Sequence, residues 1–193
     1  MFVLFEGIDT TGKTTQIEKL KEVFPTLVAT KEPGGTELGR EIRTILLEKD
    51  FKLSSNAEAL LFLADRAEHY EKVVKPNEKK IVVSDRGFVS GLAYALTNNE
   101  NIDLDFFVSL KKFALGGAFP QRIVFFKTTK ELLLSRISKK AHDTIEQRGI
   151  DYLLRVQKNM EFIIKKLNLN YIILDAKDSI ENLHVKIKGF IND

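Results

Sequence analysis

The sequence predicts an α/β fold in which a five-stranded parallel sheet is covered by helices on both faces. Short apolar runs alternate along the chain with longer segments whose apolar residues recur at helical spacing, which is the order that gives a parallel sheet. Nearly every residue within the short runs is apolar, as burial of a strand on both faces requires. With 193 residues, of which 44% are hydrophobic, the chain can build a core on each side of such a sheet.

Five apolar runs are expected to form the strands of this sheet. The first run directly precedes a glycine-containing loop, and the third ends at the polar pair Ser84-Asp85. Because ligands of such sheets bind beyond the carboxyl ends of the strands, the residues that follow these runs are the first candidates for a site. The predicted strands are 2–5, 27–30, 81–83, 123–126 and 171–174.

Segments with helical periodicity connect the predicted strands. In the segment 37–48, for example, Leu38, Ile42 and Ile45 recur on one side. The segment 56–74 is expected to end before Pro76, because a proline disfavours helical geometry at the residue that precedes it. The predicted helices are 13–24, 37–48, 56–74, 88–96, 104–115, 130–138, 150–167 and 179–191.

The loop after the first strand matches the phosphate-binding pattern G-x-x-x-x-G-K-[ST] at every fixed position. Gly7 and Gly12 permit backbone dihedrals that turn successive N–H groups into one concavity, and the helix that follows adds its positive dipole end. Lys13 can reach the β- and γ-phosphates, and the Thr14 hydroxyl can hold Mg²⁺. This strand, loop and helix predict a P-loop NTPase-type three-layer fold; a chance match in an ordinary turn is the alternative. The residues expected to bind ATP are Gly7, Ile8, Asp9, Thr10, Thr11, Gly12, Lys13, Thr14 and Thr15.

Three charged residues near this loop are further candidates. Asp85 ends a buried strand beside the phosphate loop, where a carboxylate that organises magnesium is expected. Arg86 follows it with a planar fork that can bind a phosphate bidentately. Asp9 would repel a phosphate directly, so its expected partner is a sugar hydroxyl or a hydrated metal. The alternatives are an ordinary Asp-Arg pair at a strand end and a solvated side chain in the loop.

Composition argues against several other classes of protein. The net charge of +3 is the difference between 30 basic and 27 acidic residues, without a clustered basic stripe, so no nucleic-acid polymer is expected as a partner. There is no cysteine for a disulfide or a thiolate metal site. His69, His142 and His184 are scattered and are interpreted as solvated or core residues. The chain begins inside a predicted strand and has no apolar run of membrane-spanning length, so we expect a cytoplasmic protein without a membrane partner.

Six segments, in order along nearly the whole chain, resemble the motifs of the thymidylate kinase family. They are Phe5-Glu6-Gly7-Ile8-Asp9 with Gly12-Lys13-Thr14-Thr15-Gln16, Glu32-Pro33-Gly34-Gly35-Thr36 with Gly39 and Arg43, Leu61 to Ala67, Asp85-Arg86 with Ser90, Ala93 and Tyr94, Asp143-x-Ile145-Glu146, and Leu174-Asp175-Ala176. The phosphate loop is shared by many families, but the ordered set is much more specific. The resemblance implies one nucleoside monophosphate kinase-like domain over residues 1–193. It also implies transfer of the γ-phosphate of MgATP to dTMP, which gives dTDP for dTTP synthesis.

The resemblance also implies the residues that bind the acceptor. Phe62 would stack on the thymine ring and Arg66 would bind its edge, since residues four apart share one helix face; the alternative is that Phe62 is a core residue. Arg43 and Arg86 would hold the acceptor phosphate, Tyr94 would disfavour a 2′-hydroxyl, and Pro33 would bend its loop toward the acceptor. Gly91 stands where relatives often place a polar side chain that reads the base. The implied acceptor-binding residues are Asp9, Pro33, Arg43, Phe62, Arg66, Arg86, Ser90 and Tyr94.

A lid is implied around residues 136–148. Its basic residues are Arg136, Lys139, Lys140 and Arg148. Because Thr10 and Thr11 are uncharged, the chain resembles the bacterial type, in which lid arginines neutralise the transferred phosphoryl group. Thr144 stands where relatives often have arginine, which leaves Arg136 and Arg148 as the lid candidates; a solvated basic helix end is the alternative. The catalytic residues so implied are Asp9, Lys13, Arg86, Arg136 and Arg148.

Other functions and the state of association stay open at this point. A kinase for another nucleoside monophosphate or for a nucleoside would share most of these features, and a regulatory P-loop ATPase would share the phosphate loop. A GTPase is disfavoured because the chain lacks an Asn-Lys-x-Asp guanine reader. The segment 56–74 carries more apolar surface than one face needs, which fits the homodimer that the family implies or a helix buried within the monomer.

Overall fold

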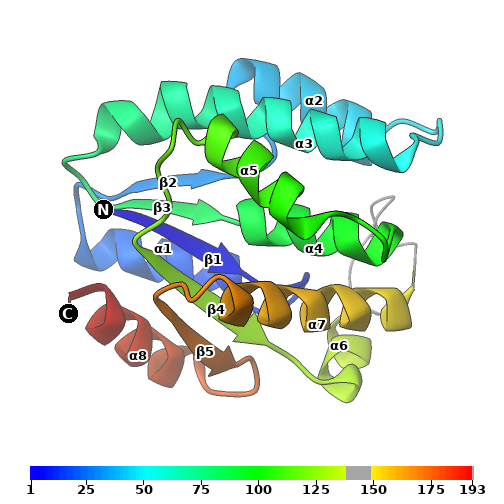
Figure 1. The fold of residues 1–193 in the computed structure, drawn as a ribbon. Coiled ribbons are helices and arrows are strands. Elements are labelled where there is room, and N and C mark those ends of the chain that lie inside the picture. Colours follow the sequence, from blue (N-terminus) through cyan, green and yellow to red (C-terminus); the bar gives the residue numbers. More distant parts are fainter. Residues whose placement is uncertain (138–148, 193) are drawn as a thin grey trace.

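The computed structural model of the chain describes residues 1–137 and 149–192, and a five-stranded parallel sheet forms its centre (Figure 1). The strands are β1 (Phe2–Glu6), β2 (Val28–Lys31), β3 (Val82–Asp85), β4 (Arg122–Lys127) and β5 (Tyr171–Asp175). Their order in the sheet is β2-β3-β1-β4-β5, and every neighbouring pair is parallel. The predicted α/β fold is confirmed.

Helices cover both faces of the sheet, as Figure 1 shows. Those of the described residues are α1 (Lys13–Val23), α2 (Glu37–Leu47), α3 (Ser55–His69), α4 (Phe88–Asn98), α5 (Leu104–Ala114), α6 (Lys130–Ile137), α7 (Ile150–Lys166) and α8 (Ile180–Asn192). Apolar residues of α1 and α8 belong to one core cluster, and those of α2, α4 and α7 belong to the other. The molecule therefore has three layers, with the sheet in the middle.

The central strand β1 shows why its sequence is apolar throughout. All five of its residues are buried. Phe2 and Leu4 pack into the core beneath α4 and α7, whereas Val3 and Phe5 pack into the core beneath α1 and α8. Alternation of side chains between the two faces requires an apolar residue at each position of a strand that is covered on both sides.

The end of the third predicted helix differs from expectation. The chain leaves α3 at His69, makes a π-helical turn over Tyr70–Val74 and continues as a short 3₁₀ helix over Lys75–Asn77. Lys75 has φ −59° and ψ −46°, so the prediction that Pro76 would exclude helical geometry there was wrong. Pro76 lies at the start of the 3₁₀ helix, where the missing N–H has no helical acceptor to lose.

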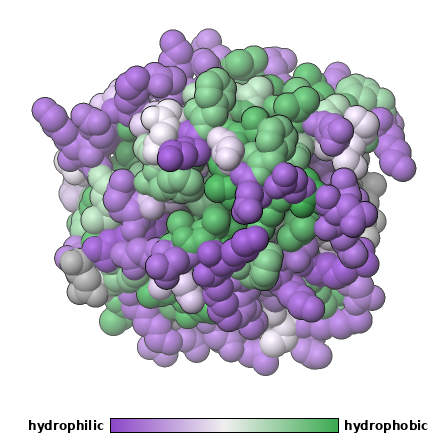
Figure 2. Space-filling model, viewed as in Figure 1, coloured by the Kyte–Doolittle hydropathy of each residue, from purple (hydrophilic) through white to green (hydrophobic). Residues whose placement is uncertain are grey.

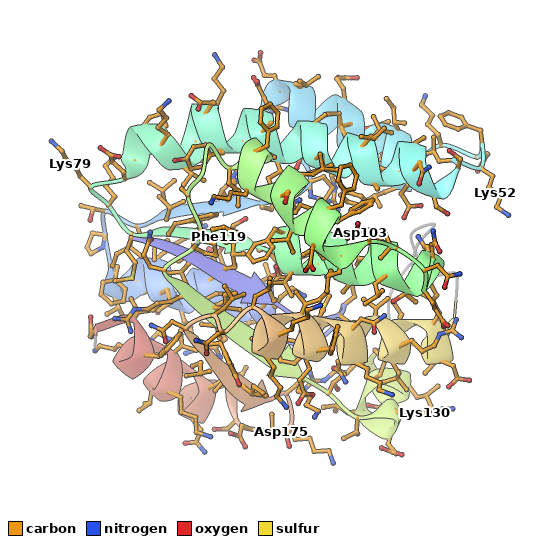
Figure 3. All side chains as sticks on the ribbon, viewed as in Figure 1. Lys52, Lys79, Asp103, Phe119, Lys130 and Asp175 are labelled. Carbon is orange, nitrogen blue, oxygen red and sulfur yellow. The ribbon has the colours of Figure 1, made fainter. Side chains whose placement is uncertain are left out.

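The carboxyl ends of the strands define one edge of the molecule. Lys79, which precedes β3, and Lys130, which follows β4, lie on opposite sides in Figure 3, toward the amino and the carboxyl ends of the strands respectively. At the carboxyl edge Phe5 pairs with Asp85, and the Arg86 N–H donates to the Phe5 carbonyl oxygen at 2.8 Å. The loop after β1 and the residues after β3 are therefore adjacent.

None of the described helices has the length and apolarity that crossing a membrane requires.

Candidate active site

The loop between β1 and α1 is held against the sheet by its own backbone. Gly7 has φ 148° and Gly12 has φ 96°, values in the left-handed region that favour glycine. A Cβ atom on Gly7 would lie 2.7 Å from the Phe126 carbonyl oxygen. The Ile8 side chain is buried in the core, and the Thr11 hydroxyl donates to the Ile8 carbonyl oxygen at 2.9 Å. The backbone is therefore the only part of Ile8 that can contact a ligand bound in this loop.

Lys13 begins α1 and folds back over the loop. Its Nζ donates to the carbonyl oxygens of Gly7 and Ile8, each at 3.0 Å, and lies 3.9 Å from Asp85 Oδ1. Burial, together with the nearby Arg86 charge, lowers the pKa of Lys13 to about 8. The amino group thus lies at the mouth of the glycine loop and is easier to deprotonate than an ordinary lysine.

Thr14 and Asp85 form the predicted pair of oxygen ligands. The Thr14 hydroxyl donates to Asp85 Oδ2 at 3.1 Å, which joins the first turn of α1 to the end of β3. Thr15 is exposed beside Thr14. A hydroxyl and a carboxylate are the oxygen groups that magnesium accepts, and Mg²⁺ keeps water and phosphate oxygens in its other positions. The residues at this point therefore fit a hydrated magnesium ion.

Arg86 connects three parts of the site. Its Nη2 forms an ion pair with Asp9 Oδ2 at 2.8 Å, and its Nη1 donates to the Gly7 carbonyl oxygen at 2.8 Å and to Ser90 Oγ at 3.3 Å. Arg86 also has φ 71°, a conformation that non-glycine residues rarely adopt and that occurs preferentially at functional sites. The Ser90 hydroxyl in turn donates to Glu6, whose pKa is raised by burial.

A single cavity collects every residue that was predicted to bind the acceptor. Its lining includes Asp9, Pro33, Arg43, Phe62, Arg66, Arg86, Ser90 and Tyr94. These residues come from the phosphate loop, from the loop after β2, and from α2, α3 and α4. The cavity shares Asp9 and Arg86 with a neighbouring, more open cavity that is lined by Thr14 and Asp85. Their separate roles stay predictions, but the structure brings all eight residues together.

The base-binding candidate Arg66 is anchored by a buried network. Its Nε donates to Glu32 Oε2 at 2.8 Å, and His69 Nδ1 is 2.8 Å from Glu32 Oε1. Burial alone would raise the pKa of Glu32, but Arg66 and His69 lower it to about 2. Arg66 Nη1 is buried and has no hydrogen-bond partner in the described structure. One end of the guanidinium is thus fixed, while the other borders the cavity.

The loop after β2 is fixed from two helices. Asp65 Oδ1 accepts a hydrogen bond from the Gly34 N–H at 2.9 Å, and burial raises the pKa of this carboxyl to about 6. Arg43 Nη1 donates to the Pro33 carbonyl oxygen at 3.1 Å. The Glu32-Pro33 peptide bond is cis. These contacts hold Pro33 and Arg43 at the cavity wall.

One of the two lid candidates lies against the phosphate loop. Arg136 on α6 donates from Nη1 to the Thr10 carbonyl oxygen at 2.8 Å and from Nη2 to the Ala176 carbonyl oxygen at 3.0 Å. Arg148 lies outside the described residues, as do Lys139, Lys140 and Thr144. Arg136 can therefore be placed beside the loop, and Arg148 cannot be placed.

Sequence reasoning missed several residues that shape the site. Glu32 and His69 form the support of Arg66, and Glu6 binds Ser90. Glu6 and Glu32 stand inside the quoted motifs, directly before Gly7 and Pro33, so their positions were an available signal. His69 carries no such signal, because its partners come from a segment more than 30 residues away.

Known proteins match this chain over nearly its whole length, including the residues of the candidate site. The family model of thymidylate kinase matches residues 5–187. The thymidylate kinase of Sulfurovum sp. (strain NBC37-1) is 54% identical over 191 residues, which cover 99% of each chain. That of Campylobacter concisus (strain 13826) is 51% identical over 193 residues, which cover 100% of this chain and 99% of the relative. A crystal structure of thymidylate kinase from Ehrlichia chaffeensis matches with a TM-score of 0.77 at 29% identity, covering 100% of this chain and 98% of the other. Because the family model spans most of its residues and its relatives match it over nearly their full length, the chain belongs to the thymidylate kinase family and uses ATP to phosphorylate dTMP to dTDP.

Proposed function

We propose that residues 7–15 bind the triphosphate of ATP and that dTMP occupies the neighbouring cavity, with Arg86 between the two. The observation that supports this arrangement is the shared wall: Asp9 and Arg86 line the acceptor cavity as well as the open cavity beside Thr14 and Asp85. A phosphate bound at Arg86 would therefore lie next to a phosphate bound at Lys13. Transfer between two bound phosphates depends on this kind of proximity.

In this proposal the acceptor is held at both ends. Arg43 and Arg86 bind the dTMP phosphate, and Ser90 and Pro33 border it. Phe62 stacks on the thymine ring, Arg66 binds the base edge with its unpartnered Nη1, and Tyr94 packs beside the sugar. Support comes from the common cavity and from the fixed orientation of Arg66 on Glu32. Because the acceptor's attacking phosphate oxygen is already ionised, no general base is needed.

The chain's cations stabilise the charge of the group in transfer. Lys13 exchanges its two carbonyl partners for β- and γ-phosphate oxygens, and Asp9 holds Arg86 in position or binds a sugar hydroxyl. We assign a lid to residues 136–148 of a single nucleoside monophosphate kinase-like domain, with Arg136 and Arg148 as its catalytic arginines. The contact of Arg136 with Thr10 supports its part in this assignment; Arg148 is proposed on sequence alone.

We also infer that Mg²⁺ accompanies ATP at this site. Thr14 and Asp85 would hold it, Asp85 through water, and its charge would offset that of the phosphates when bound. Within the described residues no cluster of three or more His, Cys, Asp or Glu side chains could hold a metal. With only Thr14 and Asp85 as protein ligands, the site fits an ion that keeps water and phosphate oxygens as its main ligands.

A homodimer is the proposed state of association, and the cytoplasm, which holds the ATP and deoxynucleotide pools, is the proposed location. Hydrophobic side chains gather on the face of α3 and α5 in Figure 2. Leu60, Phe106 and Phe113, here called the α3–α5 face, are 60%, 55% and 84% exposed. An apolar surface of this kind supports contact with a second copy of the chain.

The assignment of Lys13 can be tested by replacing it with alanine. We expect Lys13→Ala to lower kcat by roughly 100-fold or more, because a cation that stabilises the transferred group is removed. Lys19→Ala, which removes a partly exposed lysine from the same helix, should keep the wild-type rate. Rates with dTMP, dUMP, dCMP and thymidine, alongside a thermal melt of each variant, complete the measurement. Near-normal transfer by folded Lys13→Ala would refute the role of Lys13.

A further inference from the structure

Lys111 on α5 is a buried lysine to which the proposed reaction gives no part. It is only 1% exposed, whereas its neighbour Lys112 is exposed. Within residues 1–137 and 149–192, no hydrogen bond or ion pair is found for Lys111 Nζ. Since burying an amino group without an acceptor is costly, this residue calls for an explanation other than packing.

The Lys111 amino group lies beside Gly91, which lines the acceptor cavity, although Lys111 itself is not one of the lining residues. A Cβ atom on Gly91 would be 3.1 Å from Lys111 Nζ and 3.4 Å from both Arg66 Nη1 and Arg66 Nη2. Gly91 and Arg66 both line the cavity. The two nitrogen groups therefore meet at the backbone of Gly91, in the space that a side chain at position 91 would take.

Both groups have N–H donors that the described protein leaves free. Arg66 Nη1 is buried without a hydrogen-bond partner, and Lys111 Nζ has none either. The Glu32 carboxylate accepts hydrogen bonds from Arg66 and His69 and acts on Lys111 through its charge, but within the described residues no hydrogen bond or ion pair joins it to Lys111 Nζ. A ligand atom that enters the space beside Gly91 would supply an acceptor to both donors.

The protonation state of Lys111 does not change this conclusion. Burial first, and then the Arg66 charge, lower the pKa of Lys111 well below its ordinary value. A neutral amino group still has two N–H donors and an ammonium has three. A lowered pKa also reduces the repulsion between Lys111 and Arg66, which lets the two groups share one site.

We propose that Lys111 determines base specificity by donating, together with Arg66, to the carbonyl oxygen at position 4 of the acceptor's pyrimidine ring. A carbonyl oxygen has two lone pairs and can accept from both groups. The amino group of cytosine is a donor at the same position and would face the guanidinium of Arg66, which has no lone pair to accept from it, beside the N–H donors of Lys111, so it is rejected. This inference rests on the proposed placement of the base between Phe62 and Arg66.

The test compares two acceptors that differ at position 4 of the ring, dTMP and 5-methyl-dCMP. Lys111→Met keeps an unbranched side chain that is one atom shorter and removes its donors, and Lys112→Met is the matched control on the same helix. We expect Lys111→Met to lower kcat/KM for dTMP by roughly 10- to 100-fold, mainly through KM, the size of one lost hydrogen bond to a charged group. The rate with 5-methyl-dCMP should stay equal or rise, so the preference for dTMP should fall by at least the same factor. Lys112→Met should match the wild type for both acceptors.

An unchanged preference for dTMP in Lys111→Met, or an equal loss with both acceptors, would overturn the inference. If Lys111→Met does not fold, Lys111→Leu serves instead, because it also removes the amino group; a retained preference in that variant would overturn the inference equally. Phe62→Ala separates the two proposals. An unchanged KM for dTMP in Phe62→Ala refutes the placement of the base, whereas a raised KM there with an unchanged Lys111→Met refutes only the role of Lys111.

Discussion

At the scale of single residues, the functional groups of this site are held by protein partners that a ligand must replace. Lys13 donates to two carbonyl oxygens of its own loop, and Arg86 is paired with Asp9. These contacts keep each side chain within reach of its proposed phosphate. They also place the charges in a buried setting, where their protonation responds to the environment.

The binding of ATP should therefore weaken as the pH rises through about 8, the pKa to which burial lowers Lys13. Phosphate oxygens favour the charged amine, so binding above this pH requires uptake of a proton. Because the protonated form of Lys13 is lost as the pH rises, the affinity for ATP falls by up to about tenfold per pH unit above 8. Measurement of the Kd for ATP between pH 7.5 and 9.5 checks this, because the last ionisation of the terminal phosphate occurs mainly below that range.

Lys13→Met is the control for this pH dependence. It should bind ATP more weakly than the wild type at pH 7.5 and show a flat profile up to pH 9.5. If the wild type has the same flat profile, the proposed contact between Lys13 and the phosphates is wrong.

Residues that belong to a recognisable motif could be predicted from the sequence, whereas residues that act through distant partners could not. Gly7, Lys13 and Thr14 are separated by fixed intervals, so one pattern identifies them. Arg66 is different, because its orientation depends on Glu32, a residue brought to it by the fold. Lys111 looks like a solvated lysine in the sequence, and only the packing of α5 beside α3 and α4 buries it.

At the scale of elements, α2 shows how local sequence places a functional side chain. The helix begins after Thr36, whose hydroxyl accepts a hydrogen bond from the Gly39 N–H at 2.9 Å. Arg43 follows on the same helix and contacts Pro33 in the preceding loop. The cap thus fixes the start of the helix close to the acceptor cavity.

Removal of this cap should lower the stability of the protein. We expect Thr36→Ala to reduce the free energy of unfolding by about 1 kcal/mol, which corresponds to a fall in Tm of about 2–4 °C for a domain of this size. Thr36→Ser keeps the accepting oxygen and should retain most of the stability. Thermal unfolding followed by circular dichroism distinguishes them, and equal Tm values for wild type and Thr36→Ala would contradict the role of the cap.

The strands were predictable as elements because burial on both faces leaves a continuous apolar run, and all five occur within two residues of their expected places. Helix ends were harder to predict. Pro76 indicated a break before it, yet Lys75 is helical because the chain tightens into a 3₁₀ turn. A local rule for proline cannot anticipate which kind of turn the tertiary structure favours.

At the scale of the whole molecule, the α3–α5 face is an apolar surface that the fold leaves uncovered. Leu60 comes from α3, whereas Phe106 and Phe113 lie seven residues apart on α5 and share one side of that helix. The helix that contributes Leu60 also carries Phe62 and Arg66 toward the cavity. A dimer through this face would therefore lie directly behind the acceptor site.

Phe113→Glu should dissociate such a dimer. A charge in the centre of an apolar interface is expected to cost at least about 2 kcal/mol, or roughly 30-fold in Kd. Phe162→Glu is the matched control, since Phe162 on α7 is 50% exposed and lies outside the α3–α5 face. Analytical ultracentrifugation over micromolar concentrations provides the measurement. A wild type that sediments as a monomer, or a Phe113→Glu variant that stays dimeric, would exclude this interface.

The close approach of Gly7 to β4 bears on resistance to inhibitors. A methyl group at position 7 would lie 2.7 Å from the Phe126 carbonyl oxygen, and the φ of 148° excludes most larger residues as well. Any substitution there that repelled a drug would push apart the loop and the central strands at the same time. A compound that gains its affinity from the amide groups around Gly7 would leave the organism few viable escape mutations at this point.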